Sequence, residues 1–493
     1  MPALAGIQKT MISLDPRLHS KLLLRFKHFR HPWRSRRNDE AEVAATTGNS
    51  TLVPMQAYLA TLVGSDQVRV IEREVDPRFE LAAVTQAAQR EDERVTLFNR
   101  VKGTRLPVET NLYGSRKRLC DIAGGTEGNF CRRWVELTEQ LAALPASRMT
   151  RPATRPPRAP GRLDELPLIT YFEKDAGPYF TSAIYLARHP DTGVHNLSFH
   201  RSQYISNEEL RVRVGTTHDL NKYVTAAEQR GESLPAALLI GVAPEIFVAA
   251  CASLRTEEDE LAAAALMRGG PLETVSCRTI DLQVPADTQI VVEGRFLANA
   301  RRPEGPFGEF MGYYVPVGDN HVFEVSAVSL AQNAVFHSLL CGSPEDMYPL
   351  DLATAARIYR HLAQQLPGVI NVACYPFIMN TVVQIRQEYA GHARDILHAV
   401  VDANRDYSKT CMVVDEDVDL YNLNDVWWAF ITRGRADQRA EILHDMPGFY
   451  RDPHKDHWGR LLIDATKPFH RMAEFERKRI PGAGAIRLSD YTG

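Results

Sequence analysis

Residues 288–330 read TQIVVEGRFLANARRPEGPFGEFMGYYVPVGDNHVFEVSAVSL and contain two strand-like runs around a turn. The runs TQIVVEGRF and HVFEVSAVSL are rich in β-branched and aromatic residues, as strands are. Between them, Glu304-Gly-Pro-Phe-Gly-Glu309 sets two acids around a glycine- and proline-containing turn. We therefore expect both carboxylates on a tight loop that follows a strand.

Similar runs surround this stretch between residues 165 and 340. They are YFTSAIYLAR, HNLSFHRSQYI and IDLQVP, and a helical insert at 245–268 interrupts them. Short strands separated by turns indicate an antiparallel barrel or sandwich. Before residue 160 and beyond residue 345, helices and strands alternate, which indicates α/β layers on either side.

The longest apolar stretch, Leu234 to Leu254, is broken by Gly241, Pro244 and Glu245. A membrane-spanning helix would have to bury that carboxylate in lipid. We predict instead a core strand followed by a helix with Pro244 near its first turn. No membrane span is expected.

The chain has 493 residues, too many for one ordinary core. Four segments are expected: a basic N-terminal extension at 1–54, an α/β domain at 55–160, a barrel domain at 161–340 and a C-terminal α/β domain at 341–493. The extension is rich in Lys and Arg up to Arg37. We interpret it as dispensable or disordered, with an organelle transit peptide as the alternative.

The net charge of −3 argues against a nucleic-acid partner. The seven cysteines form no CxxC pair, which suits reduced thiols in a cytoplasmic protein and indicates neither a zinc site nor a disulfide framework.

The turn at 304–309 has apolar neighbours that would desolvate its acids. A carboxylic acid that stays protonated near neutral pH can donate a proton to a carbanion. The alternative is a solvated surface turn. The neighbours are Phe307, Phe310, Met311, Tyr313 and Tyr314.

EGPFGE followed by Gly-Tyr resembles the signature of the UbiD decarboxylases. Other segments agree in order: Asn196-Leu-Ser-Phe-His-Arg201, His218, and Glu260 followed nine residues on by Gly269. Further matches are NLYGSRKRL (111–119), LPLITYFEKDAG (166–177), VPADTQIVVEG (284–294) and VVDEDVDLYNLNDVWWAFITR (413–433). The resemblance runs from about residue 55 to about residue 470, and several ordered motifs are more specific than any one.

The resemblance implies an α+β multidomain fold, with a split antiparallel β-barrel that binds flavin between N- and C-terminal α/β domains. It implies non-oxidative, reversible decarboxylation of an α,β-unsaturated or (hetero)aromatic carboxylic acid through a covalent adduct with prenylated FMN. A flavin prenyltransferase would supply that cofactor. Relatives of this kind form homodimers or hexamers, and Trp427 and Trp428 are expected as packing or dimer-interface anchors.

Arg201, Glu304 and Glu309 match the catalytic Glu-Arg-Glu network of the family. By that resemblance Glu309 is the proton donor. Arg201 holds the substrate carboxylate and the flavin edge, and Glu304 keeps Arg201 oriented. For Arg201 alone, a surface or interdomain ion pair would be the ordinary interpretation.

Asn196, His218 and Glu260 match the ligands of a divalent metal that bridges to the flavin phosphate. A mixed N/O set suits Mn²⁺ or Mg²⁺ better than zinc. Because Glu260 lies in an acidic run, Glu257, Glu258 or Asp259 remain alternatives. A potassium ion is implied more weakly, at backbone oxygens near Leu197 and around 249–253.

Further contacts to the cofactor are expected around these motifs. Lys409, just before the strand TCMVV, is a candidate for the phosphate, with a solvated strand end as its alternative. The others are Ser198, Phe199, His200, Arg201 and Thr217.

Three other functions stay open at this point. A flavin oxidoreductase with unmodified FMN would not need Arg201 together with both glutamates. A non-catalytic binding relative would be expected to have lost one of the three. Metal-dependent hydrolysis has less support than the other two, because the sequence has no HExxH motif.

Overall fold

The computed structural model describes residues 55–141, 149–153, 158–446, 448–449, 451–456, 458–482 and 485–491. These residues belong to one compact unit. The basic extension at 1–54 lies outside the described residues, so the interpretation of it stays a prediction.

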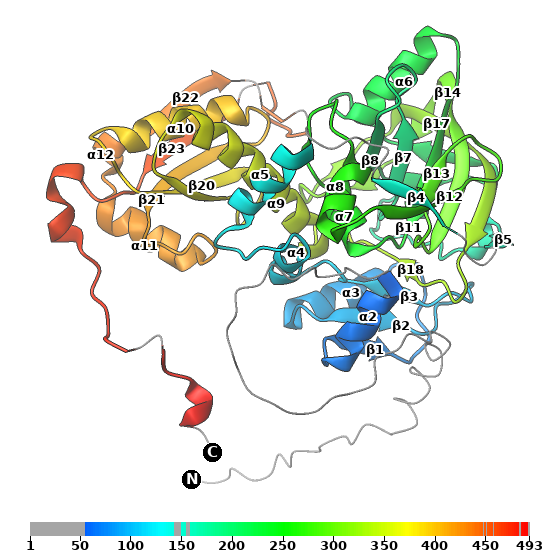
Figure 1. Ribbon diagram of the computed structural model, residues 1–493, viewed down its shortest axis with the longest axis horizontal. Coiled ribbons are helices and arrows are strands. Elements are labelled where there is room, and N and C mark those ends of the chain that lie inside the picture. Colours follow the sequence, from blue (N-terminus) through cyan, green and yellow to red (C-terminus); the bar gives the residue numbers. More distant parts are fainter. Residues whose placement is uncertain are drawn as a thin grey trace. The chain divides into compact units, whose positions relative to one another are not determined.

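A nine-stranded antiparallel sheet occupies the centre of the sequence and curls into a half-barrel (Figure 1). The strand order is β6-β9-β10-β17-β14-β11-β7-β8, and β5 pairs with β17. The strands are β5 (Ala159–Gly161), β6 (Tyr179–Phe180), β7 (Ile184–Arg188), β8 (His195–Phe199), β9 (Ser202–Tyr204), β10 (Glu209–Val212), β11 (Leu234–Ile240), β14 (Ile290–Glu304) and β17 (Gly318–Leu330).

The two faces of this sheet serve two different hydrophobic cores. On β7, Ile184 and Leu186 belong to one buried cluster, whereas Tyr185 belongs to the other. Strand side chains alternate between faces, so a strand buried on both sides becomes a continuous apolar run. In the second core Tyr185, Phe296 and Phe323 pack ring to ring, with centroids 5.1–5.3 Å apart.

Helices of the central region pack against both cores. The buried apolar side chains of α7 (Pro244–Ala250) and α8 (Glu260–Arg268) belong to the first core, whereas those of α6 (Asp219–Gln229) belong to the second. Strand β11 followed by α7, with Pro244 at the first helical turn, confirms the interpretation of the long apolar stretch. Among the described residues no helix is both long and apolar enough to cross a membrane.

Two small sheets adjoin the half-barrel. One has three strands, β4 (Thr150–Pro152), β12 (Leu272–Ser276) and β13 (Gln283–Pro285). The other is the hairpin of β15 (Phe307–Gly308) and β16 (Tyr314–Val315), which carries the acidic turn.

The N-terminal sheet has the order β1-β2-β3-β18. Its strands are β1 (Val68–Ile71), β2 (Val95–Phe98), β3 (Val108–Thr110) and β18 (Phe336–His337). Its last strand therefore comes from more than 200 residues further along the chain, a pairing that local sequence pattern does not reveal. The helices of this region are α2 (Met55–Gly64), α3 (Glu80–Glu91), α4 (Arg116–Ile122) and α5 (Phe130–Leu141).

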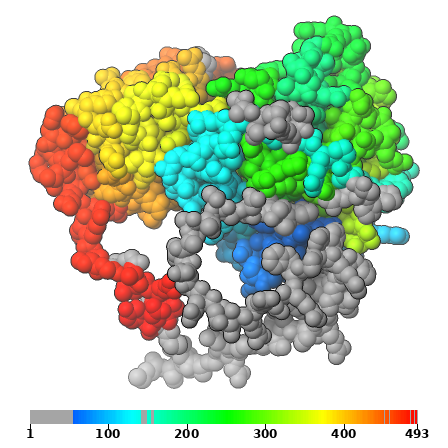
Figure 2. Space-filling model, in the orientation of Figure 1, coloured from blue at the N-terminus to red at the C-terminus, as the bar shows by residue number. Residues whose placement is uncertain are grey.

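The C-terminal region has a mixed five-stranded sheet, β19-β20-β21-β23-β22. The strands are β19 (Val369–Ala373), β20 (Asn380–Ile385), β21 (Thr410–Asp415), β22 (Ala440–Met446) and β23 (Trp458–Asp464). The helices are α9 (Pro344–Gln365), α10 (His392–Ala403), α11 (Leu423–Arg433) and α12 (Ala436–Arg439). Helix α5 packs on α9, and its cyan surface adjoins the yellow surface of the C-terminal region in Figure 2.

The predicted multidomain α/β fold with a split antiparallel barrel is confirmed. All seven cysteines lie in the described part of the chain and are free thiols, as their spacing predicted. Of the two tryptophans on α11, Trp428 packs against the C-terminal core, whereas Trp427 is 47% exposed.

Replacing Gly294 with alanine should destabilise the half-barrel. An added β-carbon would lie 2.1 Å from the Glu324 carbonyl oxygen on the paired strand β17. Overpacking of this kind costs about 1–3 kcal/mol, and the thermal unfolding midpoint should fall. Gly318→Ala, with open space at its α-carbon, is the matched control. An unchanged midpoint in Gly294→Ala would contradict the close approach of β14 and β17.

Candidate active site

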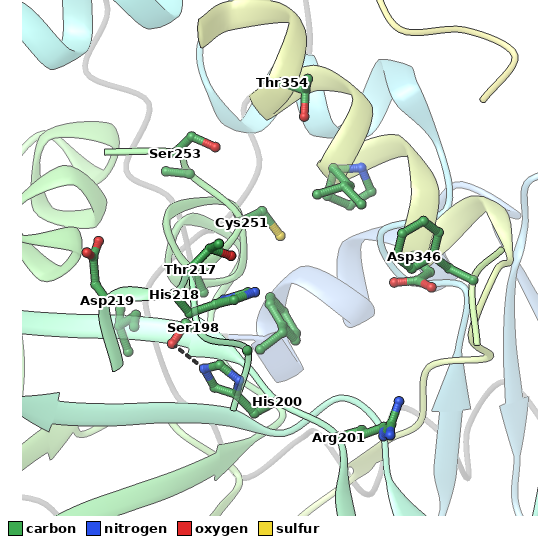
Figure 3. Close-up of a pocket in the computed structure, with 18 of the residues that line it drawn as sticks. Ser198, His200, Arg201, Thr217, His218, Asp219, Cys251, Ser253, Asp346 and Thr354 are labelled. Carbon is green, nitrogen blue, oxygen red and sulfur yellow. Dashed lines mark hydrogen bonds between the residues drawn. The ribbon is translucent and has the colours of Figure 1, made fainter. Parts of the chain in front are cut away.

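A cavity of about 530 Å³ lies between the half-barrel and α9. Its walls come from β8, the segment 213–222, the end of α7 with the following loop, the acidic turn and α9. The C-terminal region adds Asp406, Tyr407, Phe449 and Arg451. Most of the site residues expected from the sequence line it. Figure 3 shows several of these side chains.

Arg201 and Glu304 form a two-pronged ion pair at one edge of the cavity. Arg201 Nε donates to Glu304 Oε1 at 3.0 Å, and Nη2 donates to Oε2 at 2.8 Å. The Glu304 side chain is fully buried, while that of Arg201 is 11% exposed. The pair therefore presents only the guanidinium to the cavity, in a fixed orientation.

Two further donors complete the shell of Glu304. The Tyr179 hydroxyl donates to Oε1 at 2.9 Å, and Asn320 Nδ2 donates to Oε2 at 2.8 Å. Burial, and secondly the Glu304 charge, raise the pKa of Tyr179 well above its usual range, so the phenol keeps the proton that it donates. A buried carboxylate with four donors holds its cation more rigidly than a surface pair does.

The acidic turn has the tight geometry that its glycines predicted. Glu304 ends β14, and Gly305 has φ +97°, a conformation that side chains with a β-carbon rarely adopt. Glu309 follows the short strand β15, and its side chain is 3% exposed and lines the cavity.

Glu309 is paired with a residue that the sequence analysis did not single out. Its Oε1 accepts from Arg451 Nη1, and its Oε2 accepts from the backbone N–H of Met311 at 3.0 Å. Arg201 and Glu309 line the same cavity, but no hydrogen bond or ion pair joins them in the described part of the chain. Arg451 is separated from Glu309 by 142 residues, so only the fold brings them together.

Asn196, Ser198 and His200 lie at alternate positions along β8 and its continuation, so their side chains share one face. His200 Nδ1 lies 3.2 Å from the Arg213 carbonyl oxygen, which can only accept, so Nδ1 carries the proton. Burial lowers the pKa of His200 well below its usual value, so the ring is neutral and its Nε2 accepts from Ser198 Oγ at 2.8 Å (Figure 3).

This tautomer has a consequence for Asn196. Ser198 Oγ also lies 2.8 Å from Asn196 Oδ1, so its single proton is shared between two acceptors, His200 Nε2 and Asn196 Oδ1. The Asn196 side chain is held in turn by donation from Nδ2 to Glu260 Oε1 at 3.3 Å. An amide oxygen has two lone pairs, so Asn196 Oδ1 keeps at least one of them for a cation.

Glu260, rather than its acidic neighbours, faces the cavity. It is the first residue of α8 and is 4% exposed. Asp259 is the N-cap of that helix, accepts from three backbone N–H groups, one of them that of His195, and pairs with the His195 ring. Glu257 is exposed, and Glu258 accepts from the Arg255 backbone. None of these three lines the cavity among the described residues.

The residues Asn196, His218 and Glu260 fit a divalent cation by their donor chemistry. Burial raises the pKa of Glu260 well above its usual range, a cost that a bound cation would offset. His218, just before α6, turns its ring into the cavity, and desolvation lowers its pKa, so it is a neutral donor (Figure 3). Among the described residues, no group of three or more His, Cys, Asp or Glu side chains is placed to hold a metal ion. The expected set would not count as such a group, because its third ligand, Asn196, is an amide.

The other expected contacts divide into two groups. Phe199, Thr217, Leu197 and the segment 250–253 line the cavity. Lys409 is not among the described residues that line the cavity. Its ammonium group donates to Asp452 at 2.8 Å. Lys409 is therefore engaged with an acid outside the cavity lining and is not a contact of the cofactor in the proposal.

Helix α9 adds cavity residues that the sequence analysis missed. Desolvation raises the pKa of Asp346 to about 6, with the nearby Glu309 charge adding to the effect. Thr354 and Arg357 follow on the same helix. The sequence contains one signal for these cavity residues, the polar side chains within the helical pattern PEDMYPLDLATAARIYRHL. A helix face exposed to solvent shows the same pattern, so this signal could not identify them.

Glu345, at the start of α9, is fully buried at the junction of three segments. Its carboxylate accepts from the backbone N–H groups of Asn111 at 2.6 Å and Tyr113 at 2.8 Å, and its Oε1 lies 3.1 Å from His337 Nε2. Burial alone would lower the pKa of His337, but the carboxylates of Glu109 and Glu345 outweigh it and raise that pKa to about 9. His337 is thus a buried cation between two acids.

Three family models match this chain along most of its length. They are described as the N-terminal domain of 3-octaprenyl-4-hydroxybenzoate carboxy-lyase at residues 59–138, its Rift-related domain at 153–344 and its C-terminal domain at 347–465. The chain therefore belongs to the UbiD family of carboxy-lyases, as its motifs predicted.

Individual relatives agree with this assignment. The anhydromevalonate phosphate decarboxylase of Methanothermobacter thermautotrophicus is 30% identical over 421 residues, covering 84% of this chain and 97% of the relative. The UbiD-class enzyme HmfF from Pelotomaculum thermopropionicum, solved with FMN, superposes with a TM-score of 0.82 at 32% identity, covering 89% of this chain and 100% of that one. An evolved dimeric form of HmfF, solved with prFMN, gives a TM-score of 0.79 at the same identity and coverage.

Replacing Glu345 with glutamine should destabilise the protein by about 3–5 kcal/mol, the usual cost of breaking a buried ion pair. The raised pKa of His337 contributes stability that is fully present below about pH 6.5 and is lost as the pH rises through about 9. The variant should lose part of this pH dependence. Thermal unfolding at pH 6 and pH 9.5 measures both effects.

The control for this measurement is Glu416→Gln, which removes an exposed acid paired with Arg386. Surface pairs of this kind contribute roughly 0–1 kcal/mol. Equal unfolding midpoints for the two variants would show that Glu345 does not hold the junction.

Proposed function

We propose that this enzyme removes CO₂ from an α,β-unsaturated or (hetero)aromatic carboxylic acid, with prenylated FMN bound in the cavity. The observation that carries the proposal is the buried, two-pronged Arg201–Glu304 pair, which turns a guanidinium towards the cavity that Glu309 also lines. The name of the curated relative and the FMN and prFMN complexes of HmfF support it.

Each of the three residues has one role in the proposal. Loss of CO₂ from an sp² carbon leaves an electron pair that needs an acceptor, and the prenylated flavin supplies that electron sink when bound. Arg201 binds the substrate carboxylate through its fork of donors. Glu304 holds Arg201 in place, and Glu309 delivers a proton to the carbon that has lost CO₂.

For Glu309 to donate, the contact with Arg451 has to open. Both oxygens of Glu309 accept hydrogen bonds in this structure, one from Arg451 and one from the Met311 backbone. A carboxylate ion paired with a guanidinium carries no proton to donate. We propose that proton transfer follows the separation of Glu309 from Arg451, and that Asp346 beside it takes part in the exchange of protons with water.

The flavin phosphate would be held through a divalent ion, Mn²⁺ or Mg²⁺, on Asn196, His218 and Glu260. The lone pair that Asn196 Oδ1 has left and the buried carboxyl group of Glu260 support this proposal. Ser198, Phe199, His200 and Thr217 would shape the site around the cofactor. A potassium ion on backbone oxygens near Leu197 and around 249–253 stays a prediction.

The assembly is proposed as a homodimer or a larger oligomer of dimers in the cytoplasm, supplied with cofactor by a flavin prenyltransferase. On α11, Trp427 is 47% and Ile431 is 74% exposed, and large exposed apolar side chains favour a protein contact. The dimeric form of HmfF supports the same interpretation.

The cofactor gives the first test of the function. Protein produced without a flavin prenyltransferase should release almost no CO₂ from a panel of unsaturated and aromatic acids. Co-expression should restore turnover together with a flavin absorbance. Equal turnover with ordinary FMN would favour a different flavin chemistry and contradict the proposal.

Replacing Glu309 with glutamine should reduce turnover by roughly 10²–10⁴-fold, the usual contribution of a general acid. Glutamine keeps the size of the side chain but cannot deliver the proton. Incorporation of solvent deuterium into the product, measured by mass spectrometry, should fall in parallel.

The control for Glu309→Gln is Glu324→Gln, which removes a half-exposed acid on β17 of the half-barrel. Glu304→Gln is the contrast: with its anionic partner removed, Arg201 should bind substrate less well, so KM should rise as well as kcat fall. Wild-type deuterium incorporation by Glu309→Gln would rule out Glu309 as the donor.

A further inference from the structure

Arg357, on the α9 wall of the cavity, has a guanidinium without a carboxylate partner among the described residues. Its Nη2 donates to the side-chain oxygen of Asn404, a neutral acceptor, and its Nε is buried with no partner there. By contrast, Arg201 pairs with Glu304 and Arg451 pairs with Glu309. Arg357 is thus a cavity cation whose charge the described protein does not neutralise.

A polar neighbour accompanies Arg357. Thr354 also lines the cavity, and residues three apart on a helix lie on the same face. In Figure 3, Thr354 lies on α9 with its hydroxyl towards the cavity, across the view from Arg201. Tyr407, from the loop before β21, lines the same cavity. Together they make a polar end of the cavity that the proposed chemistry at Arg201, Glu304 and Glu309 does not use.

The acidic side chains nearest to Arg357 in the sequence or on the adjoining loop do not neutralise its charge. Glu345 and Asp346 open α9, eleven or more residues before Arg357, which is about 16 Å along a helix axis. The carboxylate of Glu345 is already held by Asn111, Tyr113 and His337. Asp406 is the acid on the adjoining loop, and it is exposed, so water screens its charge.

We propose that Arg357 and Thr354 bind a second anionic group of the substrate, a carboxylate or a phosphate ester. The substrate class is then an unsaturated or aromatic acid that carries a second acidic group at its far end. The inference rests on the proposed function, which assigns the reacting carboxylate to Arg201. A guanidinium with free donors matches both anions in two-pronged geometry, whereas an uncharged tail would leave the arginine unpaired.

A suitable probe is 4-carboxycinnamate, a rigid unsaturated acid that carries its second carboxylate at the end opposite the reacting one.

The test uses holoenzyme from co-expression with a flavin prenyltransferase and three substrates of one shape. They are 4-carboxycinnamate, 4-(phosphonooxy)cinnamate and the neutral-tailed 4-(methoxycarbonyl)cinnamate. We expect at least one dianionic acid to exceed the ester at least tenfold in kcat/KM, mainly through KM. Whichever of the two is preferred identifies the anion as carboxylate or phosphate. Equal values for all three would overturn the proposal.

Variants of α9 separate recognition from folding. Arg357→Gln should bring the ratio of dianion to ester close to one, and Arg357→Lys should keep part of it. The control is Arg360→Gln, because Arg360 lies on the same helix but is not among the described residues that line the cavity. This variant should leave the ratio unchanged. Flavin absorbance of Arg357→Gln should match that of the wild type. A lowered flavin content with an unchanged ratio would show that Arg357 serves the cofactor, and would overturn the proposal.

Failure of the proposed function would look different. If flavin-loaded protein releases no CO₂ from any acid, titration calorimetry with 4-carboxycinnamate, 4-(phosphonooxy)cinnamate and the ester still tests the subsite. Tighter binding of a dianion that Arg357→Gln abolishes would support the subsite alone. Equal binding of all three ligands would remove it.

Discussion

The carboxylate of Glu345 holds together segments that lie more than 200 residues apart in the sequence. It accepts from the backbone of Asn111 and Tyr113, beside the N-terminal sheet, and from His337 on β18, the last strand of that sheet. Glu345 itself opens α9, the helix that forms one wall of the cavity. A buried charge is tolerated only when its lone pairs are satisfied, so these contacts depend on one another.

The position of the cavity wall follows from that junction. Asp346 and Thr354 stand on the helix that Glu345 begins, and Arg357 comes one turn later. The opposite wall is β8 with the acidic turn, where Arg201 is held by the buried Glu304. Two buried carboxylates, each saturated by hydrogen bonds, thus define the two sides between which a substrate would lie. Rigid walls of this kind are what orientation of a reacting group requires.

Much of the half-barrel and part of the site could be predicted from local pattern. Alternation along HNLSFHR places Asn196, Ser198 and His200 on one face, and the turn residues of EGPFGE require the tight geometry that Gly305 has. These features depend on neighbours within a few residues, where propensity and periodicity act directly. The pairing of β18 with β3 could not be predicted, because a two-residue strand carries no periodicity.

The sequence by itself determined the family, the antiparallel centre of the fold and the residue types that bring acid, guanidinium and amide to one cavity. Only the tertiary structure decided that Glu309 meets Arg451, that Asp259 caps α8 and leaves Glu260 for the cavity, and that Arg357 lacks an acidic partner among the described residues. Motifs record spacing along the backbone, which local geometry converts into a shared face or a turn. Partners such as Glu309 and Arg451, 142 residues apart, are set by how sheets and helices pack as a whole, and no local pattern records that.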